Sequence, residues 1–188
     1  MKYSILVTAY DPDKKLTQMT DECIKSIEEN SVGRDYELIV LRDHLGLFSA
    51  YNVLFNKAKG DYLVVVPNDT VIMSPDWLEQ LAIPDVITSW HIGTFLLTGH
   101  KEPDGGVTCY PRTIVNKVGL YDEQFDQGYG FGDNDWFHRA HLLNIEIRAV
   151  SVKLKHNGNT TYMSYWPEKK QAMYKLCEKL FKDKWQIK

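Results

Sequence analysis

The alternation of apolar strands with amphipathic helices is the feature that most constrains what this chain can fold into. Three compact apolar runs, at residues 3–8, 37–41 and 62–66, are rich in β-forming side chains and are typical of buried strands. Between them, residues 16–27 repeat their apolar side chains at helical spacing, and a second helix is expected at residues 48–58, ended by Lys59 and Gly60. This β-α-β-α-β order predicts an α/β fold with a mostly parallel central sheet flanked by helices.

The second half of the sequence is more mixed but still alternates strands with helices. Ser74 and Pro75 are a favourable N-cap and first helical residue for a helix that ends near residue 81. Gly33 and Gly119 are placed to end two other helices. Further helices are expected at 113–118, 133–143 and 173–181, and strands at 86–89, 107–110 and 145–152, with a loop at 100–106. Because no repeat or linker interrupts them, these elements predict a single Rossmann-like domain over residues 1–188.

Composition narrows the function classes. The net charge of −3 lacks the basic excess of a nucleic-acid-binding domain, so no nucleic-acid partner is expected. No apolar stretch is long enough for a signal peptide or a membrane span. Cys23, Cys109 and Cys177 are far apart and odd in number, which predicts neither a disulfide framework nor a zinc site. A reducing, cytoplasmic compartment is the resulting expectation.

Short polar segments follow each of the first three predicted strands. They cover residues 8–13, 42–44 and 67–70. In open sheets of this kind, ligands bind beyond the carboxyl ends of the strands. The sequence therefore predicts a binding site at this edge of the sheet.

Several of these segments resemble, in order, the inverting GT-A glycosyltransferases of the family 2 type. Thr8-Ala9-Tyr10-Asp11 is similar to that family's P-x-Y-N turn, and residues 45–52 with 59–62 resemble its NLGxxxAxN…AKGxYL run. Residues 67–70 stand at its DxD-like metal motif, and residues 118–123 resemble its VGGFDE segment. The segment 132–135 stands at its ED motif, His156 at its late metal-ligand histidine, and residues 181–185 at a common ending. The glycine-aromatic run 128–132 also resembles the WGWGGEDDD segment of the β-1,4-galactosyltransferases.

The resemblance spans nearly the whole chain and implies a metal-dependent transferase. It would move a sugar from a nucleotide-sugar donor, most commonly a UDP-sugar, to a saccharide or other hydroxyl acceptor, with inversion. The donor would bind to a first half at about residues 1–70. The acceptor would bind, and the reaction would be catalysed, at about residues 71–165. An amphipathic C-terminal helix would follow at about residues 166–188. The donor-binding residues implied are Thr8, Ala9, Tyr10, Asp11, Arg42, Asp43, Asn52, Asn68 and Asp69. Ordinary surface pairing is an equal alternative for Arg42, and a role unrelated to the donor is an equal alternative for Asn52.

The sequence departs from the family pattern at three places. Pro67 stands at the first acidic position of the DxD-like motif, which leaves Asp69 as its only carboxylate. Gly132 replaces the glutamate of the ED motif. The short segment between the second and third strands makes Asp43 the best candidate for the nucleotide-binding aspartate. These departures affect the choice of donor and the affinity for the metal ion more than they affect the reaction class.

Asp69 and His156 are the implied metal ligands. A hard Mg²⁺ or Mn²⁺ ion would take the carboxylate oxygen, two phosphate oxygens and waters, and the imidazole favours Mn²⁺. The alternative for Asp69 is an Asx-turn aspartate that shapes the bend after the strand. The alternative for His156 is a solvated loop histidine.

Asp133 is the implied general base, which the attacking hydroxyl needs in order to lose its proton. The alternative is an aspartate that stabilises the start of a helix. Asp135 is expected to assist catalysis by orienting the acceptor or supporting the loop. The acceptor-binding residues implied are Tyr129, Phe131, Gly132 and Trp136, although aromatic residues here could also simply pack.

Two weaker sites also follow from the sequence. Asp135, His138 and His141 lie on one predicted helix and could share a metal, although His141 turns away from the other two. The tail 168–188 has seven lysines against three acidic residues, with Trp166 beside it, so it could touch an anionic membrane. A charged helix face that covers the core is the more common outcome.

Two other function classes remain alternatives to the transferase. A nucleotidyltransferase would have a glycine-rich loop with a basic residue after the first strand, whereas this chain has AYDPD there. A non-catalytic nucleotide- or carbohydrate-binding module on the same fold is the other. The incomplete DxD and ED motifs keep it open.

Overall fold

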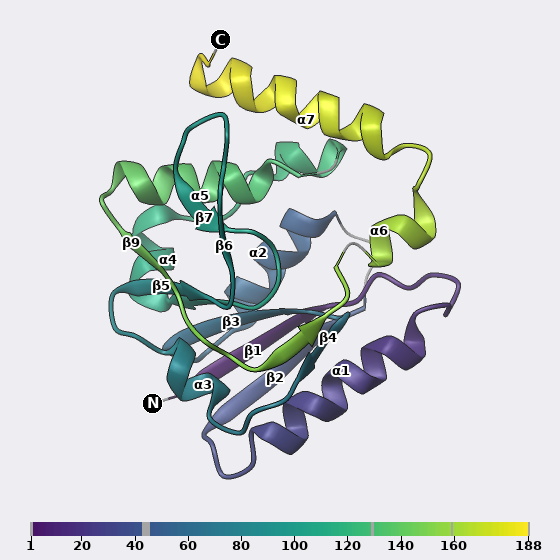
Figure 1. The fold of residues 1–188 in the computed structure, drawn as a ribbon, viewed down its shortest axis with the longest axis vertical. Helices are drawn as coiled ribbons and strands as arrows, with labels where there is room; N and C mark the ends of the chain where they lie inside the picture. The colour runs from purple at the N-terminus through teal and green to yellow at the C-terminus, as the bar shows by residue number, and fades with distance from the viewer. Residues whose placement is uncertain (1, 43–45, 129, 159, 188) are drawn as a thin grey trace.

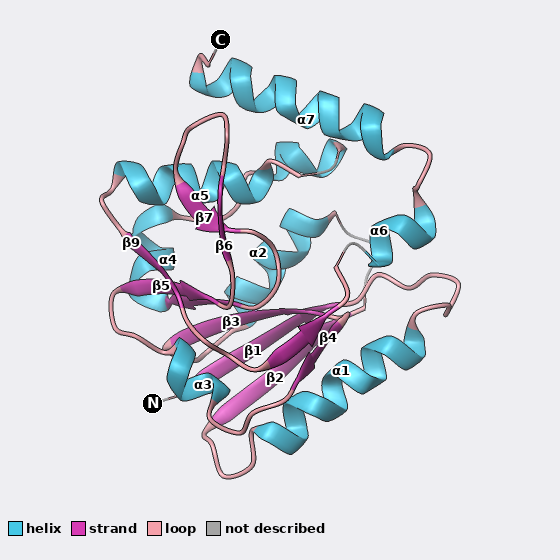
Figure 2. Ribbon diagram, in the orientation of Figure 1, coloured by secondary structure: helices cyan, strands magenta, loops and turns pink. Residues whose placement is uncertain are grey.

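The computed structural model describes residues 2–42, 46–128, 130–158 and 160–187, without the side chain of Tyr162. A six-stranded sheet forms its centre, in the order β2-β1-β3-β8-β5-β9 (Figure 2). The strands of this sheet are β1 (Tyr3–Thr8), β2 (Tyr36–Leu41), β3 (Tyr62–Pro67), β5 (Val86–Ser89), β8 (Thr108–Pro111) and β9 (Glu146–Ala149). Three neighbouring pairs are parallel, and the two pairs that involve β8 are antiparallel. The expectation of a mostly parallel α/β sheet is confirmed.

Helices cover both faces of the sheet (Figure 1). They are α1 (Thr17–Asn30), α2 (Leu47–Lys57), α3 (Trp77–Leu81), α4 (Arg112–Val118), the 3₁₀ helix η1 (Glu123–Gln127), α5 (Gly132–Leu142), α6 (Thr160–Tyr165) and α7 (Lys170–Trp185). Alternate strand residues point to opposite faces, so Ile5 belongs to a core shared with α1 and α3, whereas Leu6 belongs to a core shared with α2, α4, α5 and α7. Two cores of buried apolar side chains result, one on each face. No helix in the described part of the chain has the length and apolar character needed to cross a membrane.

Two small two-stranded sheets were not expected from the sequence. β4 (Thr70–Ile72) pairs antiparallel with β10 (Leu154–His156), and β6 (Ile92–Thr94) pairs with β7 (Lys101–Pro103). Each strand has three residues, which is too short to show a period-2 pattern in sequence. The predicted strand at 145–152 was therefore too long, because it combined β9 with the approach to β10.

Two predicted helix boundaries were also wrong. The helix expected from Ser74 begins at Trp77 instead, whose indole is fully buried and donates from Nε1 to Ser31 Oγ at 3.2 Å. Helix α1 ends at Asn30, and Gly33 lies in the following turn with φ of 78°. Gly119 does end α4, with φ of 86°.

Candidate functional site

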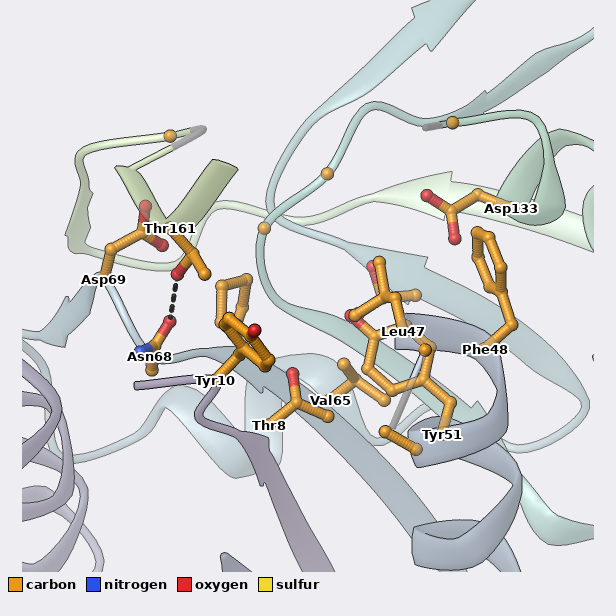
Figure 3. Close-up of a pocket in the computed structure, with 18 of the residues that line it drawn as sticks. Thr8, Tyr10, Leu47, Phe48, Tyr51, Val65, Asn68, Asp69, Asp133 and Thr161 are labelled. Atoms are coloured by element: carbon orange, nitrogen blue, oxygen red, sulfur yellow. Dashed lines mark hydrogen bonds between the residues drawn. The ribbon is translucent and has the colours of Figure 1, made fainter. Parts of the chain in front are cut away.

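A pocket of about 810 Å³ opens at the carboxyl ends of β1 and β3. This volume is within the usual range for small-molecule sites. Its floor comes from the ends of β1 and β3, one wall from the first turns of α2 and α5, and another from the segment after β10. Of the predicted site residues it gathers Thr8, Ala9, Tyr10, Asn68, Asp69, Asp133 and His156. Figure 3 shows Asp69 and Asp133 at opposite ends, with Thr8 and Tyr10 between them.

Asp69 and His156 form a pair at one end of the pocket. Asp69 Oδ1 lies 3.1 Å from His156 Nε2, and both side chains are largely buried. The short β4–β10 ladder brings them together, because His156 stands opposite Thr70, the neighbour of Asp69. The Asp69 carbonyl also accepts from Asn157 N at 3.1 Å, and Oδ2 accepts from Thr160 N at 3.4 Å.

This pair has donors that suit a divalent cation. Burial opposes ionisation of Asp69, but the hydrogen bonds and charge from His156 and Thr160 outweigh it and lower the pKa of the carboxyl. An ionised carboxylate beside an imidazole is a donor set that fits Mn²⁺. Among the described residues no group of three or more His, Cys, Asp or Glu side chains could hold an ion alone. An ion bound here would therefore need ligand oxygens, such as those of a diphosphate, to complete its coordination.

Asp133 lies at the other end of the pocket, in the first turn of α5. Burial raises the pKa of Asp133 to about 6. A carboxylate with this pKa is mostly ionised at neutral pH and is a stronger base than an exposed aspartate. Its position and pKa suit a general base.

Asp135, two residues further along α5, has a different environment. It is fully buried and is not part of the pocket lining. Its Oδ2 accepts from Arg139 Nε at 3.1 Å, and its Oδ1 lies 2.6 Å from Lys184 Nζ and accepts from Trp185 Nε1 at 3.0 Å. These contacts disagree with the predicted catalytic role, because they occupy both oxygens and join α5 to α7.

We expect Asp135→Ala to destabilise the fold rather than to remove a reacting group. The substitution would remove the partner that Arg139 and Lys184 share and leave the Trp185 Nε1 donor without its acceptor, and losing hydrogen bonds to a charged group typically costs about 1.5–3 kcal/mol. Urea denaturation of the variant should show this loss in the free energy of unfolding. Asp183→Ala, at an exposed position of α7, is the control and should change it by less than about 0.5 kcal/mol. An Asp135→Ala variant as stable as the control would contradict the structural role.

The same contacts remove the alternative metal site on α5. Asp135 is already paired with two cations, and the rings of His138 and His141 both pack against His100 on the β6–β7 hairpin. His141 Nε2 lies 2.9 Å from the carbonyl oxygen of Lys101. The histidines thus join α5 to the hairpin.

Three predicted donor-binding residues lie outside the pocket lining. Asp11 accepts from Leu16 N, Thr17 Oγ1 and the Tyr165 hydroxyl, so it shapes the turn after β1. Arg42 pairs with Asp21 at 3.3 Å on the surface. Asn52 is buried, donating to the Tyr121 carbonyl and to Glu123 and accepting from Tyr121 N. The contacts of all three residues favour a structural role. A fourth predicted donor-binding residue, Asp43, lies outside the described residues.

The predicted acceptor residues are mostly part of the core. Phe131 packs against Phe95, Tyr174 and Phe181. Trp136 is fully buried and donates from Nε1 to the Gly119 carbonyl at 2.8 Å. Tyr129 lies outside the described residues.

Gly132, the fourth predicted acceptor residue, is explained by packing. A Cβ atom at this position would clash with Cζ of the Phe48 ring. This contact leaves no space for a side chain. It accounts for the absence of the glutamate that the ED motif has at this place.

Several pocket residues escaped prediction. Trp166 lines the pocket beside the predicted Tyr10, with ring centroids 5.0 Å apart, and Tyr51 and Thr161 also line it. Asp126 also lines it and accepts from Phe48 N and Ser49 N, so it caps α2 from another part of the chain. The start of α2 has no capping side chain of its own, because its N-cap residue is Gly46. The sequence therefore already indicated that a residue from elsewhere in the chain would have to cap this helix.

The basic tail expected at the C-terminus forms α7. Lys182 pairs with Glu178 at 2.8 Å, and Lys184 pairs with Asp122 at 2.7 Å. Phe181 is fully buried, and Trp185 packs against His138. These contacts agree with a helix that covers the core.

Comparison with known proteins identifies the architecture. No known protein family and no curated protein matches the sequence. Solved structures are similar in fold. The catalytic domain of Drosophila β1,4-galactosyltransferase 7 with xylobiose matches with a TM-score of 0.60 and 17% identity, over 86% of this chain and 72% of that chain.

Two further structures extend this likeness. The mannosyltransferase PcManGT from Pyrobaculum calidifontis, with GDP-Man and Mn²⁺, matches with a TM-score of 0.53 and 16% identity, over 78% of this chain and 54% of that one. GalNAc-T7 with UDP, GalNAc and Mn²⁺ has a TM-score of 0.57 and 12% identity, over 82% and 43%. This chain therefore has the GT-A fold of these glycosyltransferases.

Proposed function

We propose that this protein is a metal-dependent glycosyltransferase that moves a sugar from a nucleotide-sugar donor to a hydroxyl group of a saccharide or other acceptor, with inversion. One observation carries the proposal. A single pocket at the carboxyl ends of β1 and β3 holds the Asp69–His156 pair at one end and Asp133 at the other. The structural neighbours complexed with UDP, UDP-Gal or GDP-Man together with manganese support a donor of this class.

The two ends of the pocket suggest how a donor lies in it. The diphosphate would approach Asp69 and His156, and Mn²⁺ or Mg²⁺ bound there would stabilise the negative charge of the leaving nucleoside diphosphate. Thr8, Ala9, Tyr10 and Asn68, at the strand ends, would contact the donor. The donor sugar would then extend toward Asp133, because the pocket continues in that direction (Figure 3).

Asp133 would act as the base. Its carboxylate accepts the proton of the acceptor hydroxyl as the hydroxyl oxygen bonds to the anomeric carbon. The bond between that carbon and the phosphate oxygen breaks, and its electron pair leaves with the nucleoside diphosphate. Burial favours this step, because it raises the pKa of Asp133 toward the working pH.

Cysteine chemistry supports a reducing, cytoplasmic location for this activity. Cys23, Cys109 and Cys177 are all buried, and Cys177 Sγ donates to the Phe125 carbonyl at 3.4 Å. Burial raises the pKa of Cys23 to about 12, so its thiol is protonated and unreactive at neutral pH.

A donor panel tests the proposal. Purified protein would be incubated with UDP-, GDP- and dTDP-sugars, with Mn²⁺ or with EDTA, and nucleotide release would be measured. We expect release with one donor class, and loss of that release in EDTA. If no donor of the panel gives nucleotide release although calorimetry shows that a nucleotide binds, the result would instead favour a non-catalytic binding module. The single carboxylate of the DxD-like motif keeps that second candidate open.

A further inference from the structure

A second buried carboxyl group lies next to the proposed base. Glu102 is in the middle of β7 and is only 4% exposed. Its Oε1 accepts from Asn134 Nδ2 at 3.0 Å, and Asn134 follows Asp133 in the first turn of α5. The next two residues of β7 and its loop, Pro103 and Asp104, line the pocket. Glu102 therefore connects the β6–β7 hairpin to the helix turn that carries the base.

The charges around Glu102 are mainly negative. Burial raises its pKa to about 8, and the charges of Asp133 and Asp104 add to this effect, whereas the Asn134 hydrogen bond opposes it. Glu102 is therefore mostly neutral at pH 7. On the other packed elements, β6 has no charged residue, and His141 of α5 contacts the Lys101 carbonyl. β9 brings Glu146 and Arg148, which pair with each other at 2.6 Å on the surface.

We propose that Glu102 is a positioning residue for the sugar transfer inferred above. As a neutral carboxylic acid it holds Asn134 and the first turn of α5, so that Asp133 faces the pocket and Glu102 adds no negative charge beside it. A pair of nearby carboxyl groups with separated pKa values lets one group hold a proton while the other stays ionised. Here Glu102 holds the proton and Asp133 is the ionised base. This inference rests on the proposed function.

Ionisation of Glu102 would have two consequences. It would add a negative charge near Asp133 that repels the anionic nucleotide-sugar donor, and this would lower kcat/KM. It would also oppose folding. The pKa of Glu102 rises from an unfolded value of 4.5 to about 8 in the fold, so the folded protein binds more protons than the unfolded chain between these limits. Stability due to this residue is therefore present below about pH 4.5 and is lost as the pH rises toward 8.

The protonation of Glu102 can be tested by thermal unfolding of Glu102→Gln, in which the amide imitates the neutral acid. We expect the Tm of the variant to equal that of the wild type near pH 4 and to exceed it by roughly 4 °C or more near pH 8.5. Glu28→Gln, at an exposed position of α1, is the matched control and should give a difference that does not change with pH. A flat Tm difference for Glu102→Gln would overturn the proposal.

The catalytic part is tested by the pH profile of nucleotide release in the presence of acceptor. Wild-type kcat/KM should fall on the alkaline side with an apparent pKa near 8, and Glu102→Gln should lack this fall. Glu102→Ala, which loses the Asn134 bond, should lower kcat about 10-fold or more at every pH, and the Gln variant should restore it. An alkaline limb that persists in Glu102→Gln would refute the positioning role. If the wild type turns over no donor although the Tm difference holds, the proposed function fails and Glu102 only holds a proton in the fold.

Discussion

Asp133→Asn is expected to lower the rate of sugar transfer by about 10²–10⁴-fold, which is the usual contribution of a general base. The amide has nearly the same size as the carboxylate but cannot accept the proton of the acceptor hydroxyl. Asp133 contributes to one end of the pocket only, so nucleotide affinity should change little. Steady-state rates and calorimetric nucleotide binding, measured on the same preparation, would separate these two effects.

The pH dependence gives an independent check on Asp133. Its pKa is about 6, so below this pH the carboxyl is protonated and cannot act as a base. Wild-type kcat should therefore fall as the pH drops through about 6. Asp183→Asn, on the surface of α7, is the control and should keep both the rate and the acid limb. If Asp133→Asn retained most of the activity, another group would have to be the base.

Asp69→Asn is the second prediction with a large effect. Asp69 is the only carboxylate at the DxD-like motif and is paired with His156 at 3.1 Å. Without it, the ion would lose a charged ligand and the leaving diphosphate would lose charge stabilisation worth several kcal/mol. We expect kcat/KM to fall by about 10²–10³-fold and the Mn²⁺-dependent part of nucleotide affinity to fall at least about 10-fold.

Nucleotide titrations with and without Mn²⁺ would measure this loss. His156→Ala should weaken the Mn²⁺ effect in the same direction, because it removes the other ligand that we propose for the ion. The Tm of both variants must be recorded, because the Asp69 carboxylate also accepts a hydrogen bond from Thr160 N. A folded Asp69→Asn variant with unchanged Mn²⁺ dependence would show that the ion binds elsewhere or that catalysis needs none.

Much of the fold could be predicted because the central strands are continuous apolar runs. β1 and β3 are buried on both faces, so hydrophobicity alone marks them, and the ligand-binding edge follows from their parallel order. The same reasoning found Thr8 and Asp69 at the strand ends. The β4–β10 ladder that joins Asp69 to His156 was missed, because three-residue strands carry no readable pattern. Only the resemblance to known motifs suggested that pair.

The roles of the two α5 aspartates needed the structure. Successive residues turn by about 100° around a helix, so Asp133 and Asp135 point to different sides. Which side faces the pocket depends on where α7 packs, and the Lys184 and Trp185 contacts to Asp135 settle this. Gly132 is a similar case. This position must be a glycine because the Phe48 ring, which is remote in sequence, fills the space that a side chain would need.

The most direct measurement is product formation. The protein would be incubated with Mn²⁺, its accepted nucleotide sugar and a mixture of saccharide acceptors, and mass spectrometry would detect an acceptor enlarged by one sugar unit. We predict such a product with the wild type, and little or none in EDTA or with Asp133→Asn. A wild-type protein that binds the nucleotide in this pocket but forms no glycoside with any acceptor would contradict the transferase and leave a binding module on the GT-A fold.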